Sequence, residues 1–433
     1  MKFISNYFEF EKNNTTFKKE ILGGLTTFLT IAYLLFVIPD ILGSVGVPKE
    51  SVFVATAISA AVGTFIMGAF AKFPMALAPG MGLNAFFAYS VVDGMGIPWQ
   101  TAFAGVFVSG AIFVVISATG LRELIIKVIP NDIKFAVSAG IGLFIAFIGL
   151  KNAGIIVGSA STYVALGDVK SLPVLITIFG LLVMAILMVR GVTSSIFIGL
   201  VVTVIAGMVT KVVPLPTAIV SMPPSMAPTF GAAITHLKDV WNVDMLLVVF
   251  TLLFMDFFDT AGTLVAVGSK VGLIKEDGTV TNGSRALLAD SVATCVGAVC
   301  GTTNTTSCME SLSGIASGAR TGFSSVVVSI MFLVSLFFSP LLTVVTSSIS
   351  APALIIVGSL LCVSLREIDW DDPVIAISAF LTIILMPLTY SIGEGIAGGF
   401  LIYIILMIAK GRVKELHPVI YGLGALFILY FVI

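Results

Sequence analysis

Two carboxylic acids stand inside apolar stretches of this 433-residue sequence. Asp259 lies near the middle of the apolar run 245–267, and Glu310 ends the polar stretch 300–310, which reads Cys-Gly-Thr-Thr-Asn-Thr-Thr-Ser-Cys-Met-Glu. A charged side chain at the centre of a bilayer costs at least ~2.5 kcal/mol, so an acid at that depth usually serves a binding site or a proton path. We therefore expect both acids to contact a substrate or to handle a proton.

Three further acids in apolar segments have structural explanations that compete with a functional one. Asp256 precedes Asp259 by three residues and shares a helix face with it, so it could be a second site group or could pair within the core. Asp290 could pair with Arg285 or cap its helix. Glu394 lies near a break between two spans, where a structural role is the simpler explanation.

Two segments with poor helix-forming sequences occupy matching positions in the two halves of the chain. The first, residues 78–87, reads Ala-Pro-Gly-Met-Gly-Leu-Asn-Ala-Phe-Phe, and the second is the polar stretch 300–310. Proline and glycine break the first, while Thr, Asn and Ser, which compete for backbone hydrogen bonds, break the second. Extended backbone at membrane depth must be paired inside the protein or line a cavity. We therefore predict two short strands that pair with each other, with Asn84 contacting a ligand or fixing the break.

These groups together favour a neutral, planar ligand. The predicted site offers two carboxylates, strand N–H groups, the positive N-termini of the helices that follow, and aromatic side chains such as Phe86. Carboxylates would accept hydrogen bonds from ring N–H groups, whereas an anion would be repelled. An acid that binds and releases a proton would couple transport to the proton gradient. The two histidines, His236 and His417, lie outside the spans, which argues against a histidine relay or a metal site.

The elements that must position these residues are membrane-spanning helices. Hydrophobic residues make up 58% of the chain and charged residues 10%, against ~45–50% and ~25% in soluble domains. The apolar runs have the length that crosses a ~30 Å hydrocarbon core. We expect an all-α polytopic protein with fourteen spans, near 21–43, 52–71, 75–92, 100–120, 133–150, 171–189, 193–213, 245–267, 286–301, 303–318, 321–346, 350–365, 372–389 and 392–409. The run 416–433 is either a fifteenth span or half of a broken last helix.

Charge predicts a cytoplasmic N-terminus in a multi-pass protein of the cell membrane. With that orientation, 17 of the 22 Lys and Arg residues fall in inside segments, as the positive-inside rule requires. The first apolar run follows about twenty polar residues and is long for a signal sequence, so we expect it to remain as a span. A net charge of −1 argues against a nucleic-acid partner, and the four cysteines contain no CxxC pair that would indicate a metal site.

Seven spans, a polar linker and seven further spans indicate a duplication. We divide the chain into an N-terminal segment (1–20), a first repeat (21–213), a linker (214–244) and a second repeat (245–433). Because seven is odd, the second repeat must be inverted relative to the first. Transporters built from inverted repeats place their site near the midplane, where corresponding helices are interrupted. The broken spans three and ten fit that description.

At these residues the chain resembles the nucleobase:cation symporter family, within the xanthine/uracil permease superfamily, and specifically its adenine/guanine/hypoxanthine permease branch. The resemblance covers nearly the whole chain. The stretches that carry it are 24–28 (Gly-Leu-Thr-Thr-Phe), 78–89, 139–144, 151–154, 258–264 (Phe-Asp-Thr-Ala-Gly-Thr-Leu), 302–311, 351–354, 371–373 and 387–391.

The resemblance implies a fold and a substrate. Spans 1–4 and 8–11 (about 21–120 and 245–346) would form a core domain, and spans 5–7 and 12–14 (about 133–213 and 350–433) a gate domain. Members are typically homodimers that move the core against the gate and carry purine bases with protons, without a cofactor. The substrate-binding set that the resemblance implies comprises Asp259, Glu310, Asn84, Ala85, Phe86, Cys308, Met309, Thr260 and Thr263, with Asp259 and Glu310 also coupling the proton.

The chain departs from the branch at two places. Cys308 and Met309 replace the expected Tyr and aliphatic residue beside Glu310, and Asp40 replaces an expected Asn. The alternatives are therefore a carrier of the same fold for uracil, xanthine or an anion, then a channel. A membrane-embedded enzyme is a weaker alternative because the chain shows no catalytic constellation such as HExxH. No Walker A motif is present that would indicate ATP-driven transport.

Overall fold

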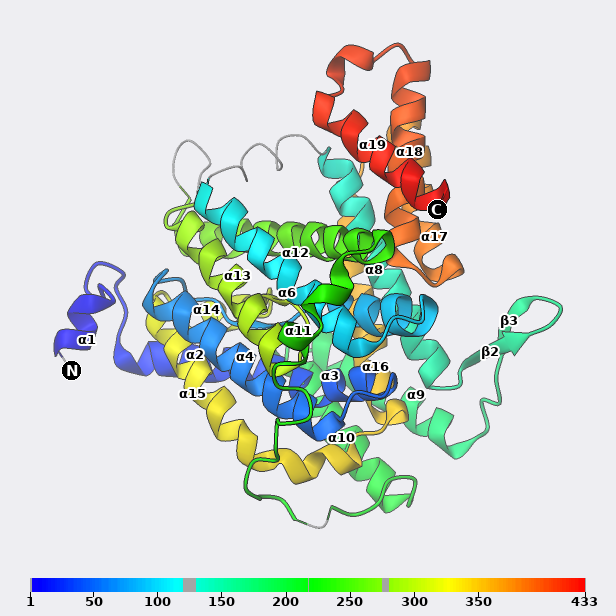
Figure 1. The fold of residues 1–433 in the computed structure, drawn as a ribbon. Helices are drawn as coiled ribbons and strands as arrows, with labels where there is room; N and C mark the ends of the chain where they lie inside the picture. The colour runs from blue at the N-terminus through cyan, green and yellow to red at the C-terminus, as the bar shows by residue number, and fades with distance from the viewer. Residues whose placement is uncertain (1, 120–129, 217, 275–279, 433) are drawn as a thin grey trace.

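The computed structural model describes residues 2–119, 130–216, 218–274 and 280–432 (Figure 1). Within these ranges nine helices are long and apolar enough to cross a membrane, and two shorter apolar helices accompany them. Exposed apolar side chains follow one face of helix α9 (Leu172–Val189) at helical spacing: Leu172, Leu175, Phe179, Leu182, Ile186 and Val189. An exposed apolar stripe of this kind is favourable in contact with lipid and unfavourable in contact with water.

The first half of the chain supplies seven membrane segments. A short helix α1 (Lys2–Tyr7) precedes them, and a β-hairpin separates the fifth segment from the sixth. The segments are α2 (Phe17–Ile31) with α3 (Leu34–Gly43), α4 (Lys49–Ala69), β1 (Leu77–Pro79) with α5 (Met81–Ala85) and the π-helix η1 (Phe86–Gly94), α6 (Trp99–Thr119), α8 (Asn131–Asn152), α9, and α10 (Ser195–Val209); the hairpin is β2 (Ile156–Ser159) and β3 (Tyr163–Leu166).

The second half repeats this order after a linker that contains α11 (Ala232–Thr235) and the 3-10 turn η2 (Leu237–Val240). Its segments are α12 (Val243–Lys270), α13 (Gly283–Cys300), β4 (Thr305–Ser307) with α14 (Ser311–Ala316), α15 (Gly322–Ser335) with η3 (Leu336–Val344), α16 (Ser347–Leu361) with η4 (Cys362–Glu367), α17 (Pro373–Thr389) and α18 (Ile392–Ala409). The expected spans thus all have counterparts, and the breaks in spans three and ten are strands, as predicted.

The first span is divided, which the sequence analysis did not foresee. Helix α2 begins at Phe17, where Thr16 caps it by accepting a hydrogen bond from the Lys19 N–H. The helix ends at Ile31, a turn follows at 32–33, and α3 then continues with Pro39 inside it. Pro39 removes a backbone donor within α3, whereas the interruption itself lies earlier, at residues 32–33, so the apolar run is not one uninterrupted α-helix. The turn places Tyr33 inside the protein, where it is only 1% exposed.

The last apolar run forms a separate helix, α19 (Pro418–Val432), which follows the turn η5 (Val413–Glu415). Figure 1 shows α19 beside α18 near the C-terminus. Its Phe427 ring packs against Phe400 of α18 and Phe250 of α12, with ring centroids 5.5 and 5.8 Å apart. The run is therefore an additional helix rather than a part of the fourteenth segment.

The two short strands meet inside the protein. Strand β1 pairs antiparallel with β4, in the register Leu77 with Ser307 and Pro79 with Thr305. Two further backbone bonds extend the ladder, from Gly80 N–H to the Asn304 carbonyl (3.1 Å) and from Cys308 N–H to the Ala76 carbonyl (2.9 Å).

Side chains of neighbouring helices satisfy the backbone groups that the ladder leaves over. Hydroxyls of Ser325, Ser311 and Thr64 accept from the N–H groups of residues 75, 76 and 77 at 2.8, 3.0 and 2.9 Å. This pairing meets the requirement that backbone polar groups at membrane depth find partners within the protein. The polar character of these helices is thus explained by the strands that they enclose.

Candidate substrate-binding site

The strand pair brings the two broken segments together. Because β1 and β4 are antiparallel, α5 starts after Pro79 at one end of the ladder and α14 starts beyond Ser307 at the other. Helix α12 passes the ladder and carries Asp259. The three segments that the sequence analysis singled out therefore form one cluster.

Asp259 is in hydrogen-bond contact with the ladder and remains accessible. The Thr306 hydroxyl of β4 donates to its Oδ2 at 3.2 Å, and the side chain is exposed. Gly262, one turn further along α12, is also exposed, and a Cβ atom placed there would meet nothing within 4 Å. This face of α12 thus borders open space beside the strands.

Gly80 makes the close approach between the strands possible. A Cβ atom at this position would lie 2.7 Å from Cγ2 of Thr306, 3.1 Å from Cδ1 of Leu83 and 3.8 Å from Oδ2 of Asp259. Any side chain here would therefore push against Thr306 and enter the space in front of Asp259. Glycine is required at this end of β1 for steric reasons.

Glu310 lies at the start of α14, half-buried. The Tyr33 hydroxyl donates to its Oε1 at 3.3 Å. Tyr33 was not among the expected site residues, and 277 positions separate it from Glu310. The fold brings them together through the turn between α2 and α3. No local sequence pattern could have linked the two.

The two residues before Glu310 have different surroundings. Cys308 is buried, with its Sγ 3.9 Å from the Thr306 carbonyl, whereas Met309 is 49% exposed. Of the two departures from the family pattern beside the site, Met309 is the one whose side chain a ligand can reach.

Asn84 is fully buried and bonded to its own segment. Its Nδ2 donates to the Gly80 carbonyl at 2.7 Å, which fixes the turn from β1 into α5, and its Oδ1 has no hydrogen-bond partner among the described residues. Ala85 and Phe86 are buried as well. Phe86 borders a very small cavity that Leu247 of α12 also lines. Of the two roles expected for Asn84, fixing the break is the one with a visible contact.

Thr260 and Thr263 are buried on α12. The Thr260 hydroxyl donates to Oδ2 of Asp290 at 2.9 Å and lies 2.9 Å from the Thr306 hydroxyl, so Thr260 links the strand to α13. The Thr263 hydroxyl has no hydrogen-bond partner within the described part of the chain.

Two more acids, Asp256 and Asp290, are buried next to β4. Asp256 accepts from Asn304 Nδ2 at 2.9 Å and from the Thr294 hydroxyl at 3.2 Å. Asp290 accepts from Ser307 at 3.4 Å as well as from Thr260. Among the described residues, no Lys or Arg forms an ion pair with any of these acids. The carboxylates therefore depend on hydroxyl and amide donors.

Neither of the two structural roles considered for Asp290 is seen, because it lies inside α13, whose N-cap is Asn282, and accepts from Thr260 and Ser307 rather than pairing with Arg285. Arg285 lies over the ring of Phe70, 5.6 Å from its centroid, while Asp290 points to the strand. A turn of helix separates the two residues in sequence, but burial favours the hydroxyl partners for the acid and leaves the cation at the surface. Glu394 lies in the first turn of α18, capped by Ser391, in line with a structural role.

The arrangement can bind a ligand that carries hydrogen-bond donors. A carboxylate offers about four acceptor positions. Asp259 and Glu310 each use one for a side-chain hydroxyl. The remaining positions can accept ring N–H groups.

Comparisons with known proteins identify the family of this chain. A family model described as "Permease family", for xanthine and uracil permeases, matches residues 18–398. The guanine/hypoxanthine permease PbuG of Bacillus subtilis is 54% identical, with 99% of each chain covered. The adenine permease AdeQ of Escherichia coli is 39% identical over 98% of this chain and 95% of its own.

Solved structures share the fold at low identity. The transmembrane domain of the cyanobacterial bicarbonate transporter BicA superposes with a TM-score of 0.65 at 16% identity, covering 86% of this chain and 95% of that domain. The murine anion transporter Slc26a9 gives a TM-score of 0.65 at 12% identity, over 91% and 69% of the two chains. This likeness bears on the fold alone, two inverted repeats of seven spans. The chain thus belongs to the xanthine/uracil permease family, in its adenine/guanine/hypoxanthine branch.

Proposed function

We propose that this protein is a symporter that imports purine nucleobases, hypoxanthine and guanine first, together with protons. The observation that supports the purine substrate most directly is the 54% sequence identity, over nearly the full length, to a guanine/hypoxanthine permease. The local chemistry supports it, because Asp259 and Glu310 contact or follow the same strand and keep acceptor positions free.

A purine base with a 6-oxo group has the complementary pattern. Its ring N–H groups would donate to the two carboxylates, and its carbonyl oxygen would accept from a backbone N–H or a hydroxyl at the strand pair. Adenine lacks the carbonyl and would lose the last of these bonds. Losing a bond to a buried polar group lowers affinity by roughly tenfold or more.

Proton coupling follows from the shortage of cations. Four acids lie close to one strand pair, and among the described residues none has a Lys or Arg partner. Moving several uncompensated negative charges through a low-dielectric region is costly. Binding a proton lowers that charge, so a loaded and protonated carrier would cross more readily than an empty one. Asp259 is the exposed member of the group and so the acid that a proton can reach.

An anion is the less suitable cargo, although the fold is shared with anion transporters. The site has carboxylates where an anion would need cations. Uracil and xanthine also carry ring N–H donors and carbonyl acceptors, so they remain the alternative cargoes.

The test is uptake of labelled hypoxanthine in cells that lack their own nucleobase carriers. We expect saturable uptake that a protonophore abolishes and that guanine, but not uracil, reduces. Uptake reduced by uracil as strongly as by guanine would contradict the purine assignment. Saturable uptake that persists with the protonophore would contradict proton coupling and leave the cargo in place.

A further inference from the structure

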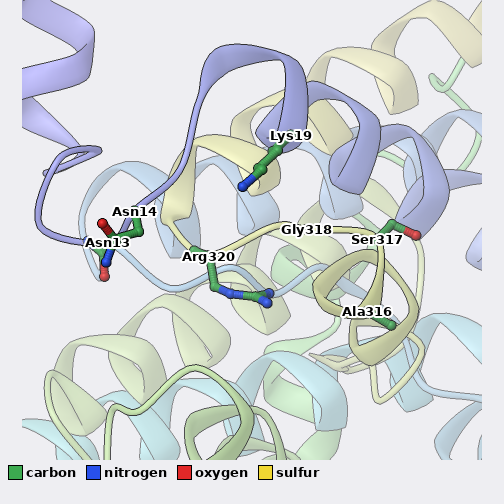
Figure 2. Close-up of a pocket in the computed structure, with 7 residues that line it drawn as sticks. All are labelled: Asn13, Asn14, Lys19, Ala316, Ser317, Gly318 and Arg320. Carbon is green, nitrogen blue, oxygen red and sulfur yellow. The ribbon is translucent and has the colours of Figure 1, made fainter.

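A basic pocket lies at the end of α14 opposite to Glu310. Its volume is about 480 Å³, and its lining comes from the segment before α2, from α2 itself and from the turn between α14 and α15 (Figure 2). The lining residues are Asn13, Asn14, Lys19, Ala316, Ser317, Gly318 and Arg320. They include two cations, two amides and a hydroxyl, and no acid.

The walls of this pocket are held together by a buried acid. Glu20 is fully buried and accepts hydrogen bonds from the Thr15 hydroxyl (2.8 Å) and the N–H groups of Arg320 (2.9 Å) and Thr321 (3.2 Å). Its carboxylate therefore ties the start of α2 to the α14–α15 turn. The rings of Phe10 and Phe17 pack edge-on against Phe323, which joins the same two segments. These hydrogen bonds and ring contacts therefore hold the walls of the pocket in place.

Among the residues that the structure describes, the two cations in the pocket form no ion pair with an acid. Nη1 of Arg320 donates to the carbonyls of Ile315 and Ala319, both at 2.7 Å, which fixes the guanidinium at the end of α14. The Lys19 ammonium forms no hydrogen bond or ion pair with the part of the chain that the structure describes. Figure 2 shows both side chains directed toward the middle of the pocket.

We propose that this pocket binds the phosphate group of an anionic ligand. A fixed guanidinium, a mobile ammonium and amide or hydroxyl donors are the groups that recognise phosphate in proteins. The pocket volume of about 480 Å³ leaves room beside a phosphate for a further group. Ile21 and Leu22 of α2 are 42% and 53% exposed beside Lys19, which places a lipid-facing surface next to the pocket. The phosphate therefore belongs either to an anionic phospholipid or to a soluble phosphate ester.

Thermal unfolding of the purified full-length protein in detergent tests this proposal. The probes are phosphatidylglycerol, the zwitterionic phosphatidylcholine, and glycerol phosphate, with chloride at equal ionic strength. We expect a saturable rise of the unfolding temperature with phosphatidylglycerol or glycerol phosphate, but not with phosphatidylcholine or chloride. In Lys19→Gln the concentration for half of this rise should increase about tenfold, the effect of one lost charge-assisted bond.

Lys18→Gln is the matched control, because Lys18 is exposed beside Lys19 and does not line the pocket. It should behave like the wild type. Stabilisation by phosphatidylglycerol alone would assign the phosphate to a lipid, and stabilisation by glycerol phosphate as well would assign it to a soluble ester. Equal losses in Lys18→Gln and Lys19→Gln, or no saturable rise with either anionic probe, would overturn the proposal. None of these readouts depends on transport.

Discussion

The four acids near the strand pair form two groups that differ in burial and in hydrogen bonding. Asp256 and Asp290 are buried, and each accepts two side-chain hydrogen bonds. Asp259 and Glu310 each accept one side-chain hydrogen bond and are at least partly accessible. The first pair is suited to holding β4 against α12 and α13. The second pair has acceptor positions left for a ligand.

Neutralising the two accessible acids should therefore have different consequences. We expect Glu310→Gln to raise the KM for hypoxanthine roughly tenfold or more, because one hydrogen bond to a charged group is worth about 1.5–3 kcal/mol. We expect Asp259→Asn to flatten the pH dependence of uptake, because it removes the exposed acid. Uptake rates measured across pH for both variants check this. Identical pH profiles that both match the wild type would refute the division of roles.

Asp372 allows a prediction about stability that does not involve the site. It caps α17, accepting from the Val374 N–H, and pairs with Lys410 (2.8 Å) and Arg412 (2.6 Å) beyond α18. The Lys410 ammonium, followed by the Val374 N–H and Arg412, holds the pKa of Asp372 at about 2. The ordinary value is ~3.9, so the stabilisation is present above about pH 4 and is lost as the pH falls toward 2.

Thermal unfolding in detergent measures this effect. Asp372→Asn keeps a capping side chain but loses both ion pairs, and should cost about 0.5–1.5 kcal/mol at neutral pH. Asp372→Ala loses the cap as well and should cost about 1 kcal/mol more. The difference between wild type and Asp372→Asn should shrink in high salt and toward pH 2. A difference that grows as the pH falls would contradict this account.

Among the elements, the ladder of β1 and β4 is the one on which the site depends. Its spacing is set at Gly80, where a methyl group would meet Thr306 at 2.7 Å. Overpacking of this kind costs roughly 1–3 kcal/mol. We expect Gly80→Ala to lower the initial rate of hypoxanthine uptake at least about tenfold, because the strands must separate or Asp259 must move.

Gly422→Ala on α19 is the matched control, since a Cβ atom there meets nothing within 4 Å. Its uptake per amount of protein in the membrane should equal that of the wild type. Wild-type uptake by Gly80→Ala would mean that the ladder tolerates the extra methyl group.

The ladder was predictable from sequence because two unhelical segments at membrane depth have few partners besides each other. Its surroundings were not. The contact of Tyr33 with Glu310 depends on the turn inside the first span, which reads as one apolar run. The partners of Asp290 depend on which face of α13 meets the strands, and its helix contains apolar and small residues all round. Local composition can predict that two extended segments pair. It cannot predict which face a helix turns toward its neighbours when its residues are apolar and small all round.

On the scale of the whole molecule, the helices pack in two groups. Helices α2, α4, α6, α12, α13, α14 and α15 pack mainly with one another, and α8, α9, α10, α16, α17 and α18 do the same. The division into a core and a gate that the family resemblance implies stays a prediction. Within the described residues, side-chain hydrogen bonds also link α3 and η1, which lie in the first four spans, to the second group. Ser350 donates to Asp40 of α3 at 2.8 Å, Asn152 donates to Tyr89 of η1 at 3.2 Å, and Ser90 of η1 donates to the Tyr390 carbonyl at 3.5 Å.

The orientation in the membrane gives a prediction that also checks the number of spans. Five spans separate the N-terminal segment from the β2–β3 hairpin, so the two must lie on opposite sides. With the N-terminus inside, 17 of the 22 Lys and Arg residues would fall in inside segments, so the positive-inside rule predicts a cytoplasmic N-terminus. Cysteines introduced as Lys12→Cys and Ser161→Cys, both at exposed positions, can report this through labelling with a membrane-impermeant maleimide.

We expect Ser161→Cys to be labelled in intact cells and Lys12→Cys only after permeabilisation. The wild-type chain is the blank, because its cysteines are buried or half-buried: Cys295, Cys300, Cys308 and Cys362. The reverse pattern would keep the five crossings and invert the protein, which would turn the proposed importer site to face the other way. Labelling of both variants in intact cells would mean an even number of crossings, and would contradict the assignment of the first five segments and with it the inverted relation of the two repeats.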